Sequence, residues 1–291
     1  MTVERRHPEW LKVKMPGSAA YLDVKRQLRT AELHTVCEEA SCPNIGECWD
    51  RKSATFMILG DVCTRACRYC DVASGKPSGL DLDEPVRLAR TVEHLGLRYC
   101  VITSVNRDDL PDGGAFIFSE CIRLIHERLP ECKVEVLTPD FQGHWKALHS
   151  LLDTGPAVLN HNIETVRRVF PSVRAKGDYD LSLEFLRHAG EYAPNIPTKS
   201  GMMVGLGETL DEVLQTMQDL RDHGVQLLTV GQYLRPSRNH IQMERFWHPS
   251  EFRTLTEEGY KMGFRHVAAG PLVRSSYHAD EQHAAATALP V

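Results

Sequence analysis

The sequence has no run of eighteen apolar residues, so it predicts no membrane-spanning helix. Its start, MTVERRHPEW, has no apolar stretch of the kind that marks a signal peptide, and we expect a cytoplasmic protein. Charge of one sign is not in large excess, since the formal net charge is −5 over 291 residues. We therefore expect no binding to nucleic acid or to a membrane. Internal repeats and low-complexity linkers are also missing, which favours one large domain, and we expect a monomer.

Cysteine, in contrast, is concentrated in one stretch of the chain. Six of the nine cysteines lie between residues 37 and 70. They form two triplets, which are Cys37, Cys42 and Cys48, and then Cys63, Cys67 and Cys70. Four and five residues separate the members of the first triplet, whereas three and two separate those of the second. This concentration predicts two separate sites built from thiols.

Three kinds of site could use such cysteines. A disulfide framework is typical of small secreted chains, which this sequence does not resemble. Structural zinc prefers four ligands, commonly two pairs of closely spaced cysteines, and it remains the alternative. Iron–sulfur clusters are held by thiolates grouped in short loops. Three cysteines leave one corner of a four-iron cluster open to a substrate or to another ligand, so the sequence favours two such clusters.

Strand and helix patterns alternate from residue 54 onward. Short apolar runs predict strands at 55–59, 99–103, 133–137, 157–159, 198–204, 227–230 and 266–269. Amphipathic spacing predicts helices at 20–34, 85–95, 115–129, 145–152, 180–192, 210–223 and 249–262, with Asp180 as the cap of one of them. This α/β alternation predicts parallel strands with right-handed crossovers in a partial TIM-like barrel, because fewer than eight units are present. An open doubly wound sheet is the alternative fold.

Polar residues follow several of the predicted strands. In α/β barrels the carboxyl ends of the strands carry the functional groups. The candidates are Ser104 and Asn106, Asn162 and Glu164, Lys199 and Gly205 in the segment KSGMMVGLGE, and Arg235 in GQYLRPS. Each of these residues could instead cap a helix or form hydrogen bonds within its loop.

The remaining cysteines and the two ends of the chain carry weaker signals. Cys100 falls within a predicted strand, Cys121 within a predicted helix, and Cys132 just before a predicted strand. These positions predict small packed side chains for Cys100 and Cys121. Residues 1–18 predict either a loosely packed terminus or an arm that closes a site. The tail after Asp280 predicts disorder.

Two of these motifs resemble a known family. The run CTRACRYC resembles the cysteine loop of the radical S-adenosylmethionine (SAM) superfamily, which has an aromatic residue, here Tyr69, before its last cysteine. The first triplet, together with RSSY at residues 274–277, is similar to the lipoyl synthase family within that superfamily. Nearly the whole chain fits this family.

The resemblance implies both a fold and an activity. It implies a partial (β/α)6 barrel over residues 53–263, an N-terminal extension over 1–52 that carries an auxiliary cluster, and a closing C-terminal segment over 264–291. The implied enzyme is a sulfurtransferase of lipoate biosynthesis with two 4Fe-4S clusters and SAM. It would insert sulfur at carbons 6 and 8 of a protein-bound octanoyl-lysine, with the auxiliary cluster as the sulfur donor. Implied partners are octanoylated lipoyl carrier domains (2-oxoacid dehydrogenase acyltransferase subunits or the glycine cleavage H protein) and an electron donor such as ferredoxin or flavodoxin.

The resemblance also implies roles for individual residues. Cys63, Cys67 and Cys70 would hold the cluster that binds SAM, and Ser276 would be the fourth ligand of the auxiliary cluster. Ser104 and Asn106 would meet the methionine amino group, Asn162 or Glu164 the ribose, and Lys199 a carboxylate, while Gly205 would lie against adenine. Tyr69 and Arg235 would join this SAM-binding group. Another sulfur-inserting radical enzyme and a non-catalytic iron–sulfur or zinc protein are the alternative functions.

Overall fold

The central element of the fold is one sheet of eight strands in sequence order. The structure is a computed structural model that describes residues 7–13, 15–51 and 53–287. The strands are β1 (His34–Thr35), β2 (Thr55–Ile58), β3 (Tyr99–Ser104), β4 (Lys133–Leu137), β5 (Val158–Asn160), β6 (Thr198–Val204), β7 (Leu227–Gln232) and β8 (His266–Gly270). β1 runs antiparallel to β2, and all other neighbours are parallel.

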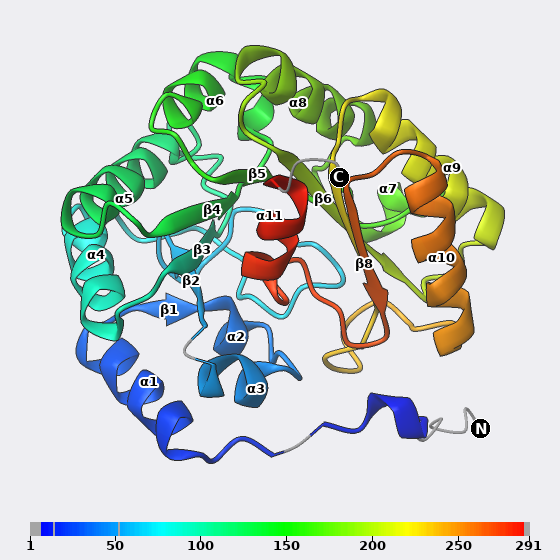
Figure 1. Ribbon diagram of the computed structural model, residues 1–291, viewed down its shortest axis with the longest axis horizontal. Helices are drawn as coiled ribbons and strands as arrows, with labels where there is room; N and C mark the ends of the chain where they lie inside the picture. The colour runs from blue at the N-terminus through cyan, green and yellow to red at the C-terminus, as the bar shows by residue number, and fades with distance from the viewer. Residues whose placement is uncertain (1–6, 14, 52, 288–291) are drawn as a thin grey trace.

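Helices on the outside of the sheet complete a partial barrel (Figure 1). Six strand–helix units pair β2 to β7 with α4 (Glu84–Leu95), α5 (Ala115–Arg128), α6 (Trp145–Leu152), α8 (Tyr179–Tyr192), α9 (Leu210–Asp222) and α10 (Pro249–Lys261). Short helices η2 (Phe141–Gly143) and α7 (Phe170–Val173) lie in the connections. β1 and β8 end the sheet without pairing to each other within the described residues, so the barrel is open there. The predicted partial barrel is therefore confirmed.

Local sequence explains where these elements begin and end. β2 and β7 are buried along their whole length, as expected for parallel strands covered on both faces. Thr209 caps α9 in a capping box with Glu212. The predicted cap of α8 was wrong, because the Asp178 side chain, and not that of Asp180, accepts the hydrogen bond from Leu181 N. No helix in the described part of the chain is long and apolar enough to cross a membrane.

A separate layer of short elements covers the open side of the barrel. It consists of α1 (Ala19–Thr30), β1, α2 (Val36–Glu39) and α3 (Ile45–Asp50), and Tyr21 of α1 stacks on Trp49 of α3 with ring centres 4.9 Å apart. The described part of the N-terminal arm runs along this side (Figure 1) and contains η1 (Glu9–Leu11). Trp10 contacts the His248 ring at 5.1 Å and Leu11 is buried, so the arm packs against the barrel there. Residues 1–6 and 14 lie outside the described residues.

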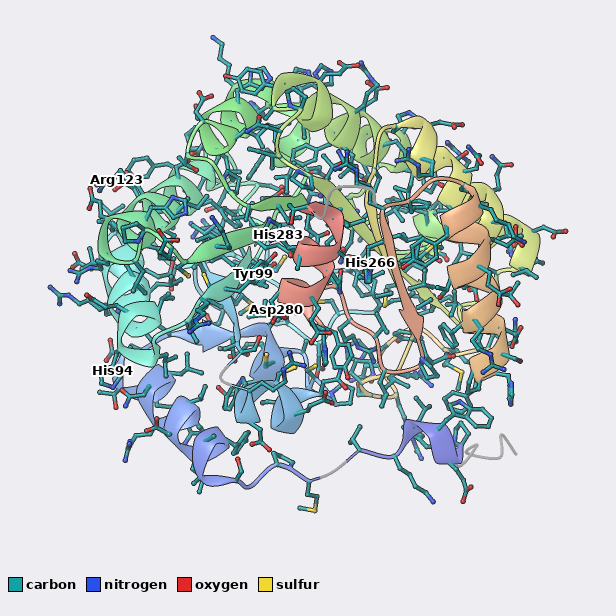
Figure 2. The ribbon with its side chains drawn as sticks, in the orientation of Figure 1. His94, Tyr99, Arg123, His266, Asp280 and His283 are labelled. Atoms are coloured by element: carbon teal, nitrogen blue, oxygen red, sulfur yellow. The ribbon has the colours of Figure 1, made fainter. Side chains whose placement is uncertain are left out.

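The C-terminal tail is helical, which corrects the predicted disorder. α11 (Ala279–Thr287) lies at the amino ends of the barrel strands (Figure 1). Its Ala286 packs with Val158 and Leu227, and its His283 contacts the Tyr99 ring at 5.7 Å (Figure 2). These contacts come from strands far away in sequence and stabilise a helix whose own pattern is only weakly amphipathic. Residues 288–291 lie outside the described residues.

Candidate functional site

The second cysteine triplet lies in the loop that follows β2, at the carboxyl end of that strand. Backbone hydrogen bonds from Cys63 N to Ala73 O (2.8 Å) and from Gly75 N to Cys63 O (2.9 Å) close this loop. A third bond joins Cys70 N to Cys67 O at 3.1 Å. The loop therefore holds its three thiols at the end of the barrel where catalytic groups are found.

Burial keeps most of the thiols of both triplets protonated in the protein alone. Burial, together with the neighbouring Cys67 and Cys63, raises the pKa of Cys70 to about 12. In the first triplet, burial raises the pKa of Cys37 to about 11 and that of Cys48 to about 12. Thiolates are the form that binds iron. These thiols therefore release their protons when they bind a metal centre.

The loop of the second triplet is fixed to the next two strand ends by Arg65. Its buried guanidinium donates to both oxygens of Asp108, at 2.9 Å each, and to Asp140 at 2.6 and 2.7 Å. Burial alone would raise the pKa of Asp140, but the hydrogen bonds from Arg65 hold it below its usual value. Such a bidentate pair is costly to break when it is buried. Arg65 thus defines the position of the cysteine loop relative to β3 and β4.

A second polar group lies beside the triplet, after β5. The pKa of Glu164 is raised by burial, which the positive charge of Arg174 and hydrogen bonds from Asn162 and Tyr69 oppose. The Glu164 backbone lies in the left-handed region, with φ of 70°, and its N–H donates a hydrogen bond to Gly201 O of β6 at 3.0 Å. Strain of this kind is concentrated at functional sites. The structure therefore brings together the predicted residues Tyr69, Asn162 and Glu164.

Arg174 is a member of this group that sequence reasoning missed. It is buried, donates to Asn162 O at 2.8 Å, and its charge acts on both Glu164 and Cys67. Because Arg174 lies twelve residues after Asn162 in a connection without a motif, no sequence signal indicates it.

Buried polar atoms without a protein partner mark the carboxyl ends of β3, β4 and β5. In the described residues, these atoms are Ser104 Oγ, Asn106 Oδ1, Thr138 Oγ1, Asn160 Oδ1, His161 Nε2, Asn162 Oδ1 and Thr165 Oγ1. Buried polar atoms normally have hydrogen-bond partners, so a polar ligand is expected here. SAM offers an amino acid group, ribose hydroxyls and a purine, and these residues fit it. The absence of a side chain at Gly201 leaves space for the Asn162 amide, because a Cβ there would lie 2.7 Å from Asn162 Oδ1.

The other predicted SAM contacts are Lys199, Gly205 and Arg235. Lys199 is fully buried, and its Nζ pairs with Glu135 at 2.9 Å. Gly205 has φ of 105°, and its N–H donates to Glu208 at 2.6 Å. Arg235 is exposed and donates to His240 O at 3.0 Å. The Lys199 charge and the Gly205 N–H thus already have partners within the protein.

The first triplet lies beside the beginning of β2. Cys37 belongs to α2 and accepts a hydrogen bond from the Thr55 backbone, and Cys48 belongs to α3. Cys37 and Cys42 lie close enough to Cys48 to contribute to its raised pKa. The two triplets therefore lie near opposite ends of one strand of four residues. Among the described residues, no three His, Cys, Asp or Glu side chains are placed to hold a single metal ion.

The segment 271–278, which follows β8, crosses to the first triplet. Asn44 Nδ2 donates to Leu272 O at 2.7 Å, and Tyr277 Oη donates to Glu47 Oε1 at 3.0 Å. The Arg274 charge acts on the Cys42 thiol. We call residues 271–278 the closing segment. Its contacts fix the end of the chain to the layer that carries the first triplet.

Ser276 of the closing segment lies next to the strand end that Cys37 contacts. Thr55 Oγ1 donates to Ser276 Oγ at 2.8 Å, and the Thr55 backbone donates to Cys37. One residue of β2 thus contacts both a cysteine of the first triplet and the predicted serine ligand.

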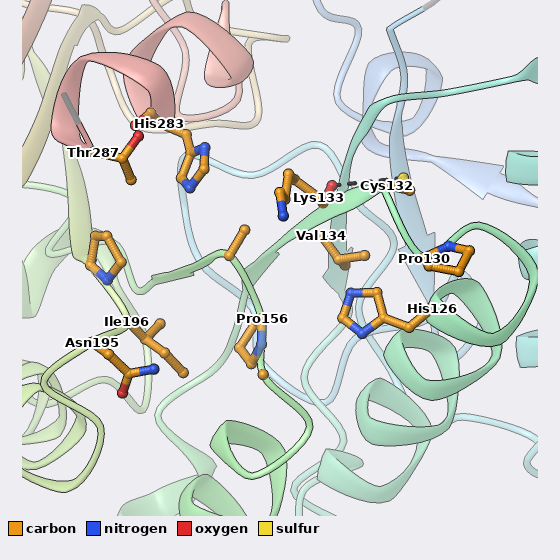
Figure 3. Close-up of a pocket in the computed structure, with 13 residues that line it drawn as sticks. His126, Pro130, Cys132, Lys133, Val134, Pro156, Asn195, Ile196, His283 and Thr287 are labelled. Atoms are coloured by element: carbon orange, nitrogen blue, oxygen red, sulfur yellow. Dashed lines mark hydrogen bonds between the residues drawn. The ribbon is translucent and has the colours of Figure 1, made fainter.

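A cavity of about 670 Å³ opens at the opposite end of the barrel (Figure 3). It lies between the amino ends of β4 and β5 and helix α11, with Cys132, Lys133 and His283 among its lining residues. None of the predicted site residues lines it. Cys100, Cys121 and Cys132 are buried members of the apolar core, which confirms the predicted packing of Cys100 and Cys121.

Comparison with known proteins identifies relatives over nearly the full length. The profile of the Radical SAM superfamily matches residues 57–220, and that of the N-terminal domain of lipoyl synthase matches residues 2–42. The chain is 58% identical to a lipoyl synthase of Symbiobacterium thermophilum, in an alignment that covers 97% of the chain and 88% of the relative. It is 56% identical to a lipoyl synthase of Rubrobacter xylanophilus, which covers 94% and 86%.

Solved structures with the same fold are more distant in sequence. A methylornithine synthase matches with a TM-score of 0.57 at 13% identity, over 72% of the chain and 62% of that structure. Coproporphyrinogen III oxidase from Escherichia coli, a radical SAM enzyme, matches with a TM-score of 0.51 at 13% identity, over 71% and 52%. At this identity the likeness supports the partial barrel alone.

Proposed function

Because the chain belongs to the lipoyl synthase family of radical SAM enzymes, we propose that it inserts sulfur at carbons 6 and 8 of an octanoyl group on a carrier-protein lysine. The observation that carries this proposal is the pair of cysteine triplets at the two ends of β2. Each triplet offers three soft thiolate ligands, which suit an iron–sulfur cluster. The substrate is an octanoylated carrier domain, of a 2-oxoacid dehydrogenase acyltransferase or of the glycine cleavage H protein, and a ferredoxin or flavodoxin supplies electrons.

The two triplets have different roles in this proposal. Cys63, Cys67 and Cys70 would hold a cluster that supplies the electron for reductive cleavage of SAM to methionine and a hydrogen-abstracting 5′-deoxyadenosyl radical. Cys37, Cys42 and Cys48 would hold a cluster that supplies sulfur. Around the second triplet, Asn162, Glu164 and Arg174 offer the hydrogen bonds and charge that would hold SAM. Arg65 fixes the cysteine loop, so that this ligand is held in one orientation.

The closing segment supports a role for Ser276 as the fourth ligand of the first-triplet cluster. Ser276 Oγ is held by Thr55, whose backbone also contacts Cys37. A serine oxygen is a harder ligand for iron than a thiolate and is more easily displaced. A cluster that gives up sulfur benefits from one corner that opens easily.

The test of the proposed function is direct product analysis. The full chain, reconstituted with iron and sulfide without oxygen, is mixed with SAM, a reductant and an octanoyl-lysine peptide. We expect methionine, 5′-deoxyadenosine and a peptide that has gained two sulfur atoms by mass spectrometry. The same peptide without its octanoyl group should gain none. A chain that binds zinc and releases no sulfide on acidification would contradict the proposal.

Replacement of Ser276 tests the fourth ligand. Ser276→Cys is expected to keep both clusters but to slow or block sulfur transfer, because a thiolate holds the opening corner more firmly. Ser276→Ala should keep a cluster on three cysteines and also impair insertion. Neighbouring Ser275 provides the matched control, since Ser275→Ala should leave insertion unchanged. Equal, full activity of both alanine variants would remove Ser276 from the ligand set.

A further inference from the structure

The Cys63 sulfur is surrounded by three N–H donors. Arg65 N lies 3.4 Å from Cys63 Sγ, and Asn106 contributes both its backbone N at 3.3 Å and its side-chain Nδ2 at 3.7 Å. Two of the three donors thus belong to a single residue, which comes from the loop after β3 and not from the cysteine loop itself. The oxygen of the same amide, Asn106 Oδ1, is buried and has no partner among the described residues.

Other contacts hold this arrangement in place. Thr64 donates to Asn106 O twice, through its backbone N and its Oγ1, at 3.0 Å each. Asp108 N donates to Thr64 Oγ1 at 3.1 Å, and Arg65 bridges from the cysteine loop to Asp108. The two loops therefore form one unit, in which the Asn106 donors keep a fixed place relative to Cys63. A preset donor costs no reorganisation when the charge on sulfur changes.

Hydrogen bonds to a cysteine ligand alter how easily its cluster takes up an electron. Reduction increases the negative charge on the cluster and its sulfur ligands, and N–H donors stabilise that charge. Hydrogen bonds to charged groups are stronger than those between neutral groups. Donors at Cys63 therefore favour the reduced form and raise the reduction potential, whereas their loss lowers it.

We infer that Asn106 is a positioning residue that sets the reduction potential of the cluster on the second triplet through its two N–H donors to Cys63. This inference rests on the proposed function, because it requires a cluster on Cys63, Cys67 and Cys70. It assigns Asn106 a role toward the cluster ligand, in addition to the predicted contact of its amide with SAM.

The test is a redox titration of the full reconstituted chain, followed by electron paramagnetic resonance. The signal that changes when SAM is added identifies the second-triplet cluster, and the other cluster is the internal reference. Asn106→Ala removes one of the two Asn106 donors and keeps the backbone donor. We expect its reduced-to-oxidised ratio at fixed potential to fall about tenfold, which is ~59 mV for a one-electron couple. The Asn106→Asp side chain has the same shape but replaces the N–H donor with an anion. Its reduction potential should therefore fall further than that of Asn106→Ala.

Asn195→Ala is the control, because it truncates an amide that lines the cavity at the opposite end of the barrel, away from both triplets. Its potential should equal that of the wild type before SAM is added. Wild-type iron and sulfide content with an unchanged potential in both Asn106 variants would overturn this inference alone. Wild-type protein without iron and sulfide would overturn the proposed function and this inference together.

Discussion

Replacement of Cys63, Cys67 and Cys70 together by alanine is expected to abolish formation of 5′-deoxyadenosine and to halve the bound iron. Two four-iron clusters give about eight irons per chain, and the variant should retain about four. The reason is that these three thiols are the only described cysteines at the carboxyl end of β2, beside Glu164 and Arg174. Iron and acid-labile sulfide analysis, with chromatographic assay of 5′-deoxyadenosine, measures both effects.

Cys132→Ala is the control for that experiment. It removes a buried thiol outside both triplets, so iron content and 5′-deoxyadenosine should match the wild type. Continued cleavage of SAM by the triple variant would show that this loop does not hold the reactive cluster.

Replacement of Cys37, Cys42 and Cys48 by alanine should affect sulfur insertion and not the cleavage of SAM. This variant is expected to cleave SAM, because the loop after β2 and its Arg65 contacts remain. No sulfur should reach the octanoyl chain, since the proposed donor is gone. Mass spectrometry of the peptide and assay of 5′-deoxyadenosine in the same sample separate the two steps.

A lipoyl product from the variant without the first triplet would mean that sulfur has another source. Loss of both activities would be ambiguous if the variant failed to fold. Circular dichroism and retention of about four irons per chain therefore accompany the assay.

The barrel could be predicted because its signals are local. Each strand is a short apolar run, and each outer helix has an apolar face, so the pattern along the chain suffices. α11 could not be predicted in this way. Its Ala286 is buried by Val158 and Leu227, which lie in two different strands, and only the folded barrel brings them together. The short elements β1, α2 and α3 were also missed, because they are too short to show a period.

The candidate site could likewise be predicted only where its signals are local. The spacing of the cysteines and the motif around Ser276 were visible in the sequence, and the structure places Ser276 beside Thr55. The partners of charged residues were not visible. Arg65 meets Asp140 across 75 positions, and Lys199 meets Glu135 across 64. No local pattern records such pairs, so the sequence cannot show that the Lys199 ammonium group already has a buried carboxylate partner.

The closing segment has a consequence for the order in which the protein matures on the ribosome. Asn44 and Leu272 are 228 positions apart, and Glu47 and Tyr277 are 230. Synthesis proceeds from the amino end, and early parts of a chain can fold before later parts exist. The cysteines of the first triplet are made long before Ser276 and its neighbours in the closing segment. The closing segment can therefore pack against the layer that carries the first triplet only after the chain has been made through residues 272–277.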